Sequence, residues 1–117
     1  MKVVIAGSRG FEDYEVVRNN CDTLLDGISV DAVLCGECKG VDLLGKRYAN
    51  ERGIAVESFP ADWKRYGRAA GPKRNKQMAE NADVLIAFWD GVSKGTKNMI
   101  KLMGDKPVYI VRIDSAE

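Results

Sequence analysis

A run of small and hydroxyl-bearing residues lies in the second half of the chain, from Gly91 to Thr96. Its glycines, Gly91 and Gly95, allow the backbone to approach a ligand closely. Ser93 and Thr96 add hydroxyl groups, and the helix predicted to follow offers unpaired backbone N–H groups at its N-terminus. The segment is therefore predicted to bind an anion, with phosphate or a phosphate-bearing nucleotide as the expected ligand.

Two segments in the first half of the chain have a similar character. Gly7, Ser8 and Arg9 follow the first apolar run, where Arg9 either pairs with a phosphate or carboxylate or is a solvated residue in a simple turn. This first turn lacks the G-x-G-x-x-G fingerprint, and no acidic residue ends the second apolar run. A standard NAD site is therefore not expected.

The second of these segments contains Gly36, Gly40 and Asp42 and leads into a predicted helix. The N-terminus of a helix attracts anions. Asp42 either caps this helix or faces a ligand. The two glycines permit either the close approach of a ligand or tight packing of the backbone, and both interpretations remain open.

Basic residues gather between positions 64 and 76 and are interleaved with Trp63 and Tyr66. They are interpreted as a contact surface for nucleic acid, as the rim of a nucleotide pocket, or as a solvated face. The formal net charge of the whole chain is only +1, which favours one small polyanion over a polymer. The cluster consists of Lys64, Arg65, Arg68, Lys73, Arg74 and Lys76.

Three aspartates lie nearest to these segments. Asp62, beside Trp63, and Asp90, after the fourth apolar run, are interpreted as ligand contacts, for example to ribose hydroxyls. Asp83 precedes a buried strand and is interpreted as a turn or capping residue. We interpret the three methionines at helical spacing, Met78, Met99 and Met103, as core residues.

The chain contains no histidine and three cysteines. The absence of histidine excludes Ser-His and Cys-His nucleophile pairs and His-ligated zinc. The odd cysteine count argues against a disulfide framework. Cys35 and Cys38 have C-x-x-C spacing, but no second pair completes a zinc site, and Cys35 is interpreted as a core residue. No metal or cofactor is therefore expected.

Short apolar runs alternate with amphipathic stretches along the chain. This alternation predicts one α/β domain over residues 1–113, with a tail at 114–117 and a five-stranded parallel sheet in the order 3-2-1-4-5 that carries helices on both faces. Ligands bind such sheets beyond the carboxyl ends of the strands, where the polar segments fall. The predicted strands are 3–6, 32–35, 54–59, 84–89 and 108–112, the predicted helices are 13–27, 41–52, 72–81 and 96–103, and 60–71 is a predicted loop.

The same sequence carries no feature of a membrane protein. No run approaches the roughly 18 apolar residues of a spanning helix. Met1 and Lys2 lead directly into a short apolar strand, without the long apolar region of a signal peptide. We therefore expect a cytoplasmic protein that makes no membrane contact.

Read in order, these motifs closely resemble the YspA-like branch of the SLOG superfamily over nearly the whole chain. The resemblance implies a Rossmann-like fold and an origin in bacteria or their phages. The superfamily also contains the Lonely Guy phosphoribohydrolases, DNA-processing protein A and sensor domains for nucleotide-derived signals. The residues that carry the resemblance are Gly7-Ser8-Arg9, Gly36, Gly40, Asp42, Phe59 to Trp63, Tyr66-Gly67, Ala70 to Pro72, Arg74-Asn75, Met78, Ala82-Asp83 and Phe88 to Met99.

The resemblance to the Lonely Guy enzymes is partial. Arg74 and Met78 match an Arg and a Met of that group, and the Gly40-x-Asp42 segment is similar to a loop of DNA-processing protein A. The catalytic Glu of the Lonely Guy G-T-x-x-E motif is replaced here by Met99, and a thioether cannot replace a carboxylate as a general base. The remaining candidates for a catalytic role are Asp62, Asp90 and Arg74.

The resulting hypothesis is a protein that binds or senses a nucleoside phosphate or an ADP-ribose-like ligand. The alternatives are hydrolysis of an N-glycosidic bond in a nucleoside monophosphate and binding of single-stranded DNA. A homodimer is a further expectation from the resemblance. The expected ligand-binding residues are Gly7, Ser8, Arg9, Gly36, Gly40, Asp42, Asp62, Trp63, Arg74, Asn75, Asp90, Gly91, Ser93, Gly95 and Thr96.

Overall fold

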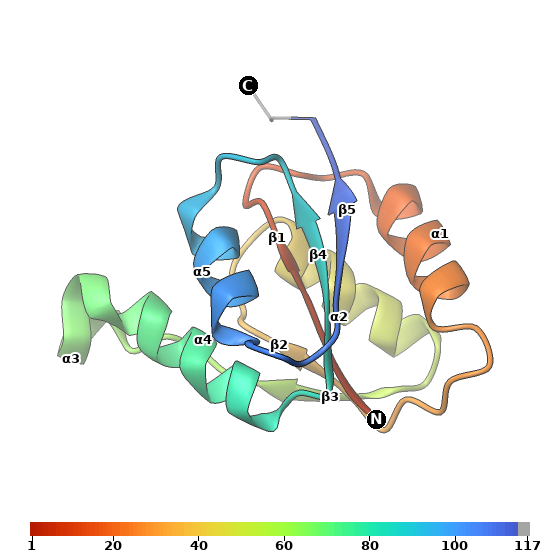
Figure 1. Ribbon diagram of the computed structural model, residues 1–117, viewed down its shortest axis with the longest axis horizontal. Coiled ribbons are helices and arrows are strands. Elements are labelled where there is room, and N and C mark those ends of the chain that lie inside the picture. The colour runs from red at the N-terminus through yellow and green to blue at the C-terminus, as the bar shows by residue number, and fades with distance from the viewer. Residues whose placement is uncertain (115–117) are drawn as a thin grey trace.

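The computed structural model describes residues 1–114 and contains a five-stranded parallel sheet with helices on both faces (Figure 1). The strand order β3-β2-β1-β4-β5 confirms the predicted topology. Apart from Asp114, the predicted tail lies outside the described residues. The strands are β1 (Lys2–Gly7), β2 (Ala32–Cys35), β3 (Ala55–Ser58), β4 (Val84–Trp89) and β5 (Val108–Arg112).

Two layers of helices enclose the sheet because the side chains of its central strands alternate between its faces. Val3 and Ile5 of β1 belong to the core beneath α1 and α2, whereas Val4 and Ala6 belong to the core beneath α4 and α5. The helices are α1 (Tyr14–Leu24), α2 (Val41–Glu51), α3 (Trp63–Tyr66), α4 (Ala70–Asn81) and α5 (Lys94–Leu102), with a short 3₁₀ helix, η1 (Gly67–Ala69).

The predicted loop at 60–71 is wrong, because this segment contains α3, η1 and the first residues of α4. Asp62 starts α3 by accepting a hydrogen bond from the backbone N–H of Arg65 at 3.1 Å. Pro72 lies in the first turn of α4, where its missing N–H costs little. Other predicted boundaries differ from the structure by a few residues at element ends.

The segment Gly91 to Thr96 is only partly a loop, because α5 begins at Lys94 with Ser93 as its N-cap residue. The helix thus begins two residues before its predicted start at 96. Gly95 and Thr96 therefore lie in its first turn. The three helical methionines are buried as predicted, at Met78, Met99 and Met103. Among residues 1–114, no helix combines the length and apolar character needed to cross a bilayer.

Candidate functional site

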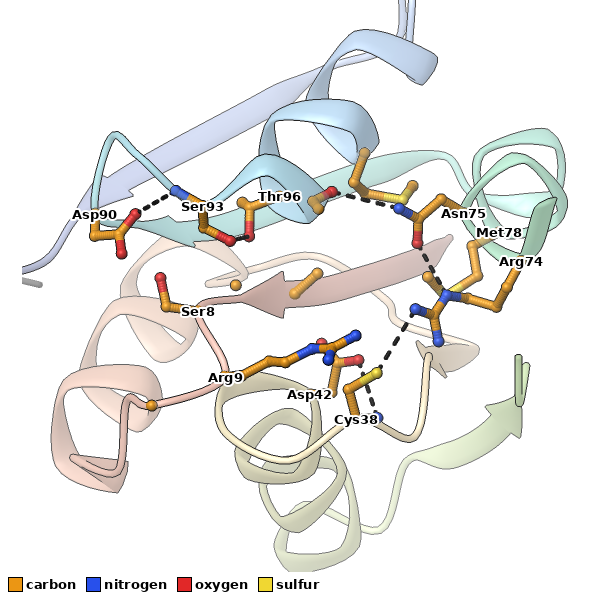
Figure 2. A pocket seen from close by; sticks show the side chains of 15 residues that line it. Ser8, Arg9, Cys38, Asp42, Arg74, Asn75, Met78, Asp90, Ser93 and Thr96 are labelled. Atoms are coloured by element: carbon orange, nitrogen blue, oxygen red, sulfur yellow. Dashed lines mark hydrogen bonds between the residues drawn. The ribbon is translucent and has the colours of Figure 1, made fainter. Parts of the chain in front are cut away.

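A cavity of about 300 Å³ opens at the carboxyl ends of β1 and β4 (Figure 2). The chain crosses back over the sheet between β3 and β4, so β1 and β4 flank the topological switch point, where ligands of such sheets bind. The β1–α1 loop, the β2–α2 loop, α4 and the β4–α5 segment all contribute to it. The cavity is lined by Ala6, Gly7, Ser8, Arg9, Gly10, Cys38, Asp42, Arg74, Asn75, Met78, Asp90, Ser93, Gly95, Thr96 and Met99.

The structure thus brings most of the expected ligand-binding residues to one place. Five of them do not line the cavity, namely Gly36, Gly40, Asp62, Trp63 and Gly91. The expectation of a shared edge came from the topology, because the carboxyl ends of parallel strands meet on the same side of a sheet. The roles of individual residues depend on contacts that the topology alone does not specify.

The first turn of α5 forms one wall of the cavity. The Asp90 carboxylate accepts hydrogen bonds from the backbone N–H groups of Val92 (2.9 Å) and Ser93 (2.8 Å), which turns the chain into the helix. These two bonds hold the pKa of Asp90 below its usual value. The hydroxyls of Ser93 and Thr96 lie 3.3 Å apart. Asp90 is therefore a structural residue of this turn as well as part of the lining.

Space for a ligand adjoins this turn at Gly95. A Cβ atom built at Gly95 meets no atom within 4 Å outside its chain neighbours and the backbone of its own helix, so this side of the first helical turn faces an open volume. The first backbone N–H groups of an α-helix lack partners within the helix and carry the positive end of its dipole. This wall is suited to an anionic group.

Ser8 lies across the cavity from α5, at the carboxyl end of β1 (Figure 2). Ser8 is 6% exposed, and its Oγ is the buried side-chain polar atom without a hydrogen-bond partner within 3.5 Å in the described part of the chain, although it lies close enough to the Asp90 carboxylate to contribute to the lowered pKa of that group. A buried hydroxyl without a partner costs roughly 1–3 kcal/mol. Such a group in a cavity wall indicates a place where a ligand can supply the missing partner.

Arg74 of α4 lies in the cavity wall formed by α4 and the β2–α2 loop. It is buried, with 7% of its surface exposed. Its Nε donates to Oδ1 of Asn75 at 2.9 Å, its Nη1 donates to the carbonyl of Gly36, and its Nη2 lies 3.7 Å from Sγ of Cys38. Arg74 therefore joins α4 to the β2–α2 loop. It contributes positive charge to the cavity while several of its N–H groups are used within the protein.

Asp42 places a carboxyl group in the same wall. It is 7% exposed and accepts a hydrogen bond from the backbone N–H of Cys38 at 3.3 Å. Burial raises the pKa of Asp42 to about 6, although the charges of Arg74 and Arg9 and the Cys38 bond act in the opposite direction. The N-cap residue of α2 is Gly40, so the interpretation of Asp42 as a side-chain helix cap is wrong.

The glycines of these loops are explained by packing. A Cβ at Gly36 would lie 2.7 Å from Oδ2 of Asp42 and 2.8 Å from Nη1 of Arg74. A Cβ at Gly40, where φ is +85°, would overlap the carbonyl oxygens of Ser8 and Arg9. Of the two open interpretations, close backbone and side-chain packing is therefore the one that the structure supports.

Asn75 connects the two helices that flank the cavity. Its Nδ2 donates to the carbonyl of Gly95 at 3.3 Å and to Oδ1 of Asn98 at 3.0 Å, while its Oδ1 accepts from Arg74. Both the nitrogen and the oxygen of the side-chain amide thus have partners within the protein. Asn75 therefore positions the start of α5 relative to α4, and it also lines the cavity, so its expected contact to a base or ribose stays a prediction.

Asp62 and Trp63 lie outside the cavity. Asp62 is the N-cap of α3, where its carboxylate is used by the Arg65 N–H. Trp63 is 49% exposed, and the guanidinium carbon of Arg9 lies 5.9 Å from the centre of its ring. Because Arg9 lines the cavity, Trp63 lies at the rim, beyond the enclosed volume.

Several lining residues were not among the expected ligand contacts: Ala6, Gly10, Cys38, Met78 and Met99. Met78 follows Arg74 by one helical turn, a spacing that places both on the same face of α4. Cys38 lies in the predicted β2–α2 loop, which was itself expected at the site. Met78 is both a core residue and part of the cavity lining, so the two roles do not exclude one another.

The parallel sheet and the strand order define a Rossmann-like domain with a cavity at its switch point. The family described as YspA, cpYpsA-related SLOG family matches residues 1–66, which is more than half of the chain. The chain belongs to this SLOG family. The matched segment includes Ser8, Arg9 and Asp42, whereas Arg74 and the start of α5 lie beyond it. No curated protein matches the chain.

Proposed function

We propose that this protein binds a nucleotide or a nucleotide-derived ligand at the carboxyl edge of its sheet. The observation that carries the proposal is the Ser8 hydroxyl, which is buried in the cavity wall without a partner and lies across from the start of α5. A phosphate at this position would accept hydrogen bonds from Ser8 and from the hydroxyls of Ser93 and Thr96. The positive end of α5 and the charge of Arg9 would neutralise it.

The cavity supports one orientation of the ligand. Ligand cavities commonly span roughly 300–1,000 Å³, so the volume of about 300 Å³ is suited to a ribose phosphate more than to an entire dinucleotide. Asp42 lies in the wall opposite α5 and would accept a hydrogen bond from a ribose hydroxyl. A base would then extend toward the rim, where Trp63 lies beside Arg9.

Ligand-induced thermal stabilisation tests this proposal. The protein is heated with AMP, ADP, ADP-ribose, ribose 5-phosphate, adenosine or inorganic phosphate, each at a series of concentrations. A ligand at about 100 times its Kd adds about 2.7 kcal/mol to the free energy of unfolding, which corresponds to a rise in Tm of the order of 10 °C. We expect the phosphate-bearing nucleosides to raise Tm and adenosine to have a much smaller effect.

A matched pair of variants connects the effect to the cavity. Thr96→Val removes a buried hydroxyl from the first turn of α5, whereas Thr23→Val removes an exposed hydroxyl from α1. We expect Thr96→Val to weaken nucleotide binding about tenfold or more and Thr23→Val to leave it unchanged. Equal binding by both variants, or no stabilisation of the unmodified protein by any phosphate compound, would contradict the proposal.

A second candidate function, hydrolysis of an N-glycosidic bond, is favoured by Asp42. A carboxyl group with a raised pKa in a cavity is a candidate acid or base. In this reaction the bond between the base and the sugar breaks, the oxygen of water bonds to the anomeric carbon, and a proton moves to the departing base. Asp62 lies outside the cavity and Asp90 is held by backbone N–H groups, so Asp42 replaces them as the carboxylate to test.

Product analysis decides between binding and hydrolysis. AMP is incubated with the protein, and free adenine and ribose 5-phosphate are separated by chromatography. Hydrolysis that disappears in Asp42→Asn and persists in Asp90→Asn supports the second function. Stable binding of intact AMP without release of adenine excludes it.

A further inference from the structure

An exposed basic surface extends from the rim of the cavity along α3 and the first turns of α4. Every residue from Asp62 to Ala69 is exposed, and α3 lies at one end of the molecule, away from the sheet (Figure 1). A helical segment that buries so little is not explained by the core. We define the basic surface by its exposed cations and rings: Lys64, Arg65, Arg68, Lys73, Lys76, Trp63 and Tyr66.

The cations of this surface are not neutralised within the described residues. None of them takes part in an ion pair there, whereas ion pairs occur on β1, β3, α1 and α2. Asp62 is the one acidic residue between positions 62 and 76, and its carboxylate is used as the N-cap of α3. The near-neutral charge of the whole chain therefore conceals a local concentration of positive charge.

The two rings of the basic surface differ in their surroundings. Cations lie over Tyr66, with the guanidinium carbon of Arg65 at 5.1 Å and Nζ of Lys73 at 4.8 Å from the ring centre. Trp63 lies against the start of α4, since a Cβ at Gly71 would be 3.3 Å from its ring. The Trp63 ring is therefore packed against α4 on one side and half exposed. It lies between the cavity and the cations of the basic surface.

We propose that the basic surface binds a single-stranded nucleic acid whose end nucleotide enters the cavity. The inference rests on the proposed function, and it names the nucleotide as part of a strand. Cations spaced along a surface with an exposed ring match the alternation of phosphates and bases in a single strand. An acidic peptide would pair with the cations but would not use Trp63, and a duplex hides the faces of its bases.

Fluorescence anisotropy with a labelled oligothymidylate of about 12 nucleotides tests the inference, a length within the site sizes of single-strand binders. Arg65→Glu/Arg68→Glu is compared with Lys97→Glu/Lys101→Glu, a pair on the exposed face of α5 that changes the net charge equally. We expect the first variant to lose tenfold or more in affinity and the second less than twofold. Trp63→Ala should weaken binding about 5- to 150-fold, the effect of one lost stacking contact.

Parallel thermal-shift measurements with AMP separate this inference from the proposed function. Stabilisation by AMP that is equal in Arg65→Glu/Arg68→Glu and the unmodified protein, with oligonucleotide binding lost, supports both. Stabilisation by AMP without oligonucleotide binding overturns the inference alone, and oligonucleotide binding without an AMP effect overturns the proposed function and the placement of the end nucleotide. Equal binding of duplex DNA or polyglutamate, or an equal loss in the α5 variant, overturns the inference.

Discussion

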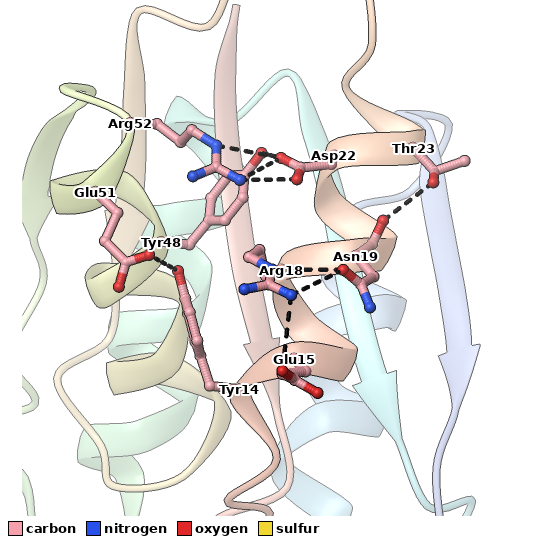
Figure 3. Close-up of polar contacts among 9 residues, drawn as sticks. All are labelled: Tyr14, Glu15, Arg18, Asn19, Asp22, Thr23, Tyr48, Glu51 and Arg52. Atoms are coloured by element: carbon pink, nitrogen blue, oxygen red, sulfur yellow. Dashed lines mark hydrogen bonds and ion pairs between the residues drawn. The ribbon is translucent and has the colours of Figure 1, made fainter.

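Arginine and tyrosine lie together on two surfaces of this protein, with different consequences. At the seam between α1 and α2 (Figure 3), the guanidinium carbon of Arg52 lies 5.0 Å from the ring centre of Tyr48, and its Nη2 pairs with Asp22 at 2.7 Å. On the basic surface, Arg65 lies at a similar distance from Tyr66, 5.1 Å, but pairs with no acid in residues 1–114. The two surfaces thus differ in whether an acidic residue neutralises the arginine: Asp22 does so at the seam, and no acid does so for Arg65 in residues 1–114.

The acids of the seam also bind the tyrosine hydroxyls. The Tyr48 hydroxyl donates to Asp22 at 2.7 Å, and the Tyr14 hydroxyl donates to Glu51 at 2.9 Å, so each bond joins α1 to α2. The bonds from Arg52 and Tyr48 hold the pKa of Asp22 below its usual value. At the seam the charges are used to join two helices. On the basic surface the same residue types remain available to a partner.

The largest expected effect concerns Arg74, the buried member of the basic run. Arg74→Ala should lower the free energy of unfolding by about 3–5 kcal/mol, because it removes two buried hydrogen bonds from a charged group, to the Gly36 carbonyl and to Oδ1 of Asn75, each of which contributes about 1.5–3 kcal/mol. Arg65→Ala should change it by less than about 0.5 kcal/mol, as expected for an exposed residue. Urea denaturation of both variants measures the contrast. Similar losses in the two variants would contradict the division of the run into one buried and several free cations.

Asp42 should give the stability of the protein a distinct pH dependence. Its pKa is raised from 3.8 to about 6 in the folded protein, so between these values the folded state holds a proton that the unfolded state has released. Its contribution is therefore complete below about pH 4 and is lost as pH rises through 6, with a total of about 3 kcal/mol. Urea denaturation at a series of pH values measures this change.

Asp42→Asn is the matched variant for the pH experiment, because its amide oxygen can still accept the Cys38 N–H. The carboxyls with lowered pKa, such as Asp22 and Glu51, act in the opposite direction, because the stability that they contribute is lost as the pH falls. We expect the fall in stability between pH 4 and 7 to disappear in Asp42→Asn. The same fall in both proteins would show that Asp42 is not its source.

A smaller effect is expected from the tyrosine hydroxyls of the two surfaces. Tyr48→Phe removes the bond to Asp22 and should lower the free energy of unfolding by about 1 kcal/mol, or Tm by a few degrees. Tyr66→Phe is the control, because the Tyr66 ring is 39% exposed and its hydroxyl makes no hydrogen bond within residues 1–114. Thermal unfolding compares them. An equal effect at both positions would remove the distinction between the surfaces.

The sheet was predictable from the sequence, whereas α3 was not. The runs at Val84–Trp89 and Val108–Arg112 have strand bounds as predicted, because short apolar runs between turns indicate the strands of a parallel sheet, although only the first is buried and the second is an exposed edge strand. The α3 segment consists of exposed, basic and aromatic residues, so it has no apolar periodicity to indicate a helix. It is formed by a local cap, the Asp62 carboxylate on the Arg65 N–H.

The position of the candidate site at the carboxyl edge of the sheet was also predictable, but the structural roles of its individual residues were not. Topology brings Ser8, Asp42 and Thr96 to one edge of the sheet. By contrast, the contact between Arg74 and the carbonyl of Gly36 spans 38 positions in the sequence, and no local pattern indicates it. Some residues expected to touch a ligand therefore also hold the walls of the cavity in place, as Asn75 does between α4 and α5.

Ser8→Ala gives the smallest change in stability and the sharpest test of the difference between the seam and the cavity. At the seam the tyrosine hydroxyls have partners, so their removal should destabilise the protein. The Ser8 hydroxyl has none, and its removal should leave the free energy of unfolding unchanged or raise it by about 1 kcal/mol. Urea denaturation without ligand measures this effect, with Ser58→Ala as a control that removes a hydroxyl bonded to Glu37.

Addition of a nucleotide should reverse the order of the unmodified protein and Ser8→Ala. With AMP at saturating concentration, the unmodified protein gains a hydrogen bond from Ser8 to a charged acceptor, a bond that contributes about 1.5–3 kcal/mol. Ser8→Ala cannot form it and should show a smaller rise in Tm. A variant that is less stable without ligand, yet equally stabilised by AMP, would assign Ser8 to the framework of β1. The opposite pattern, a fold that tolerates the change and a ligand that does not, is what a binding hydroxyl predicts.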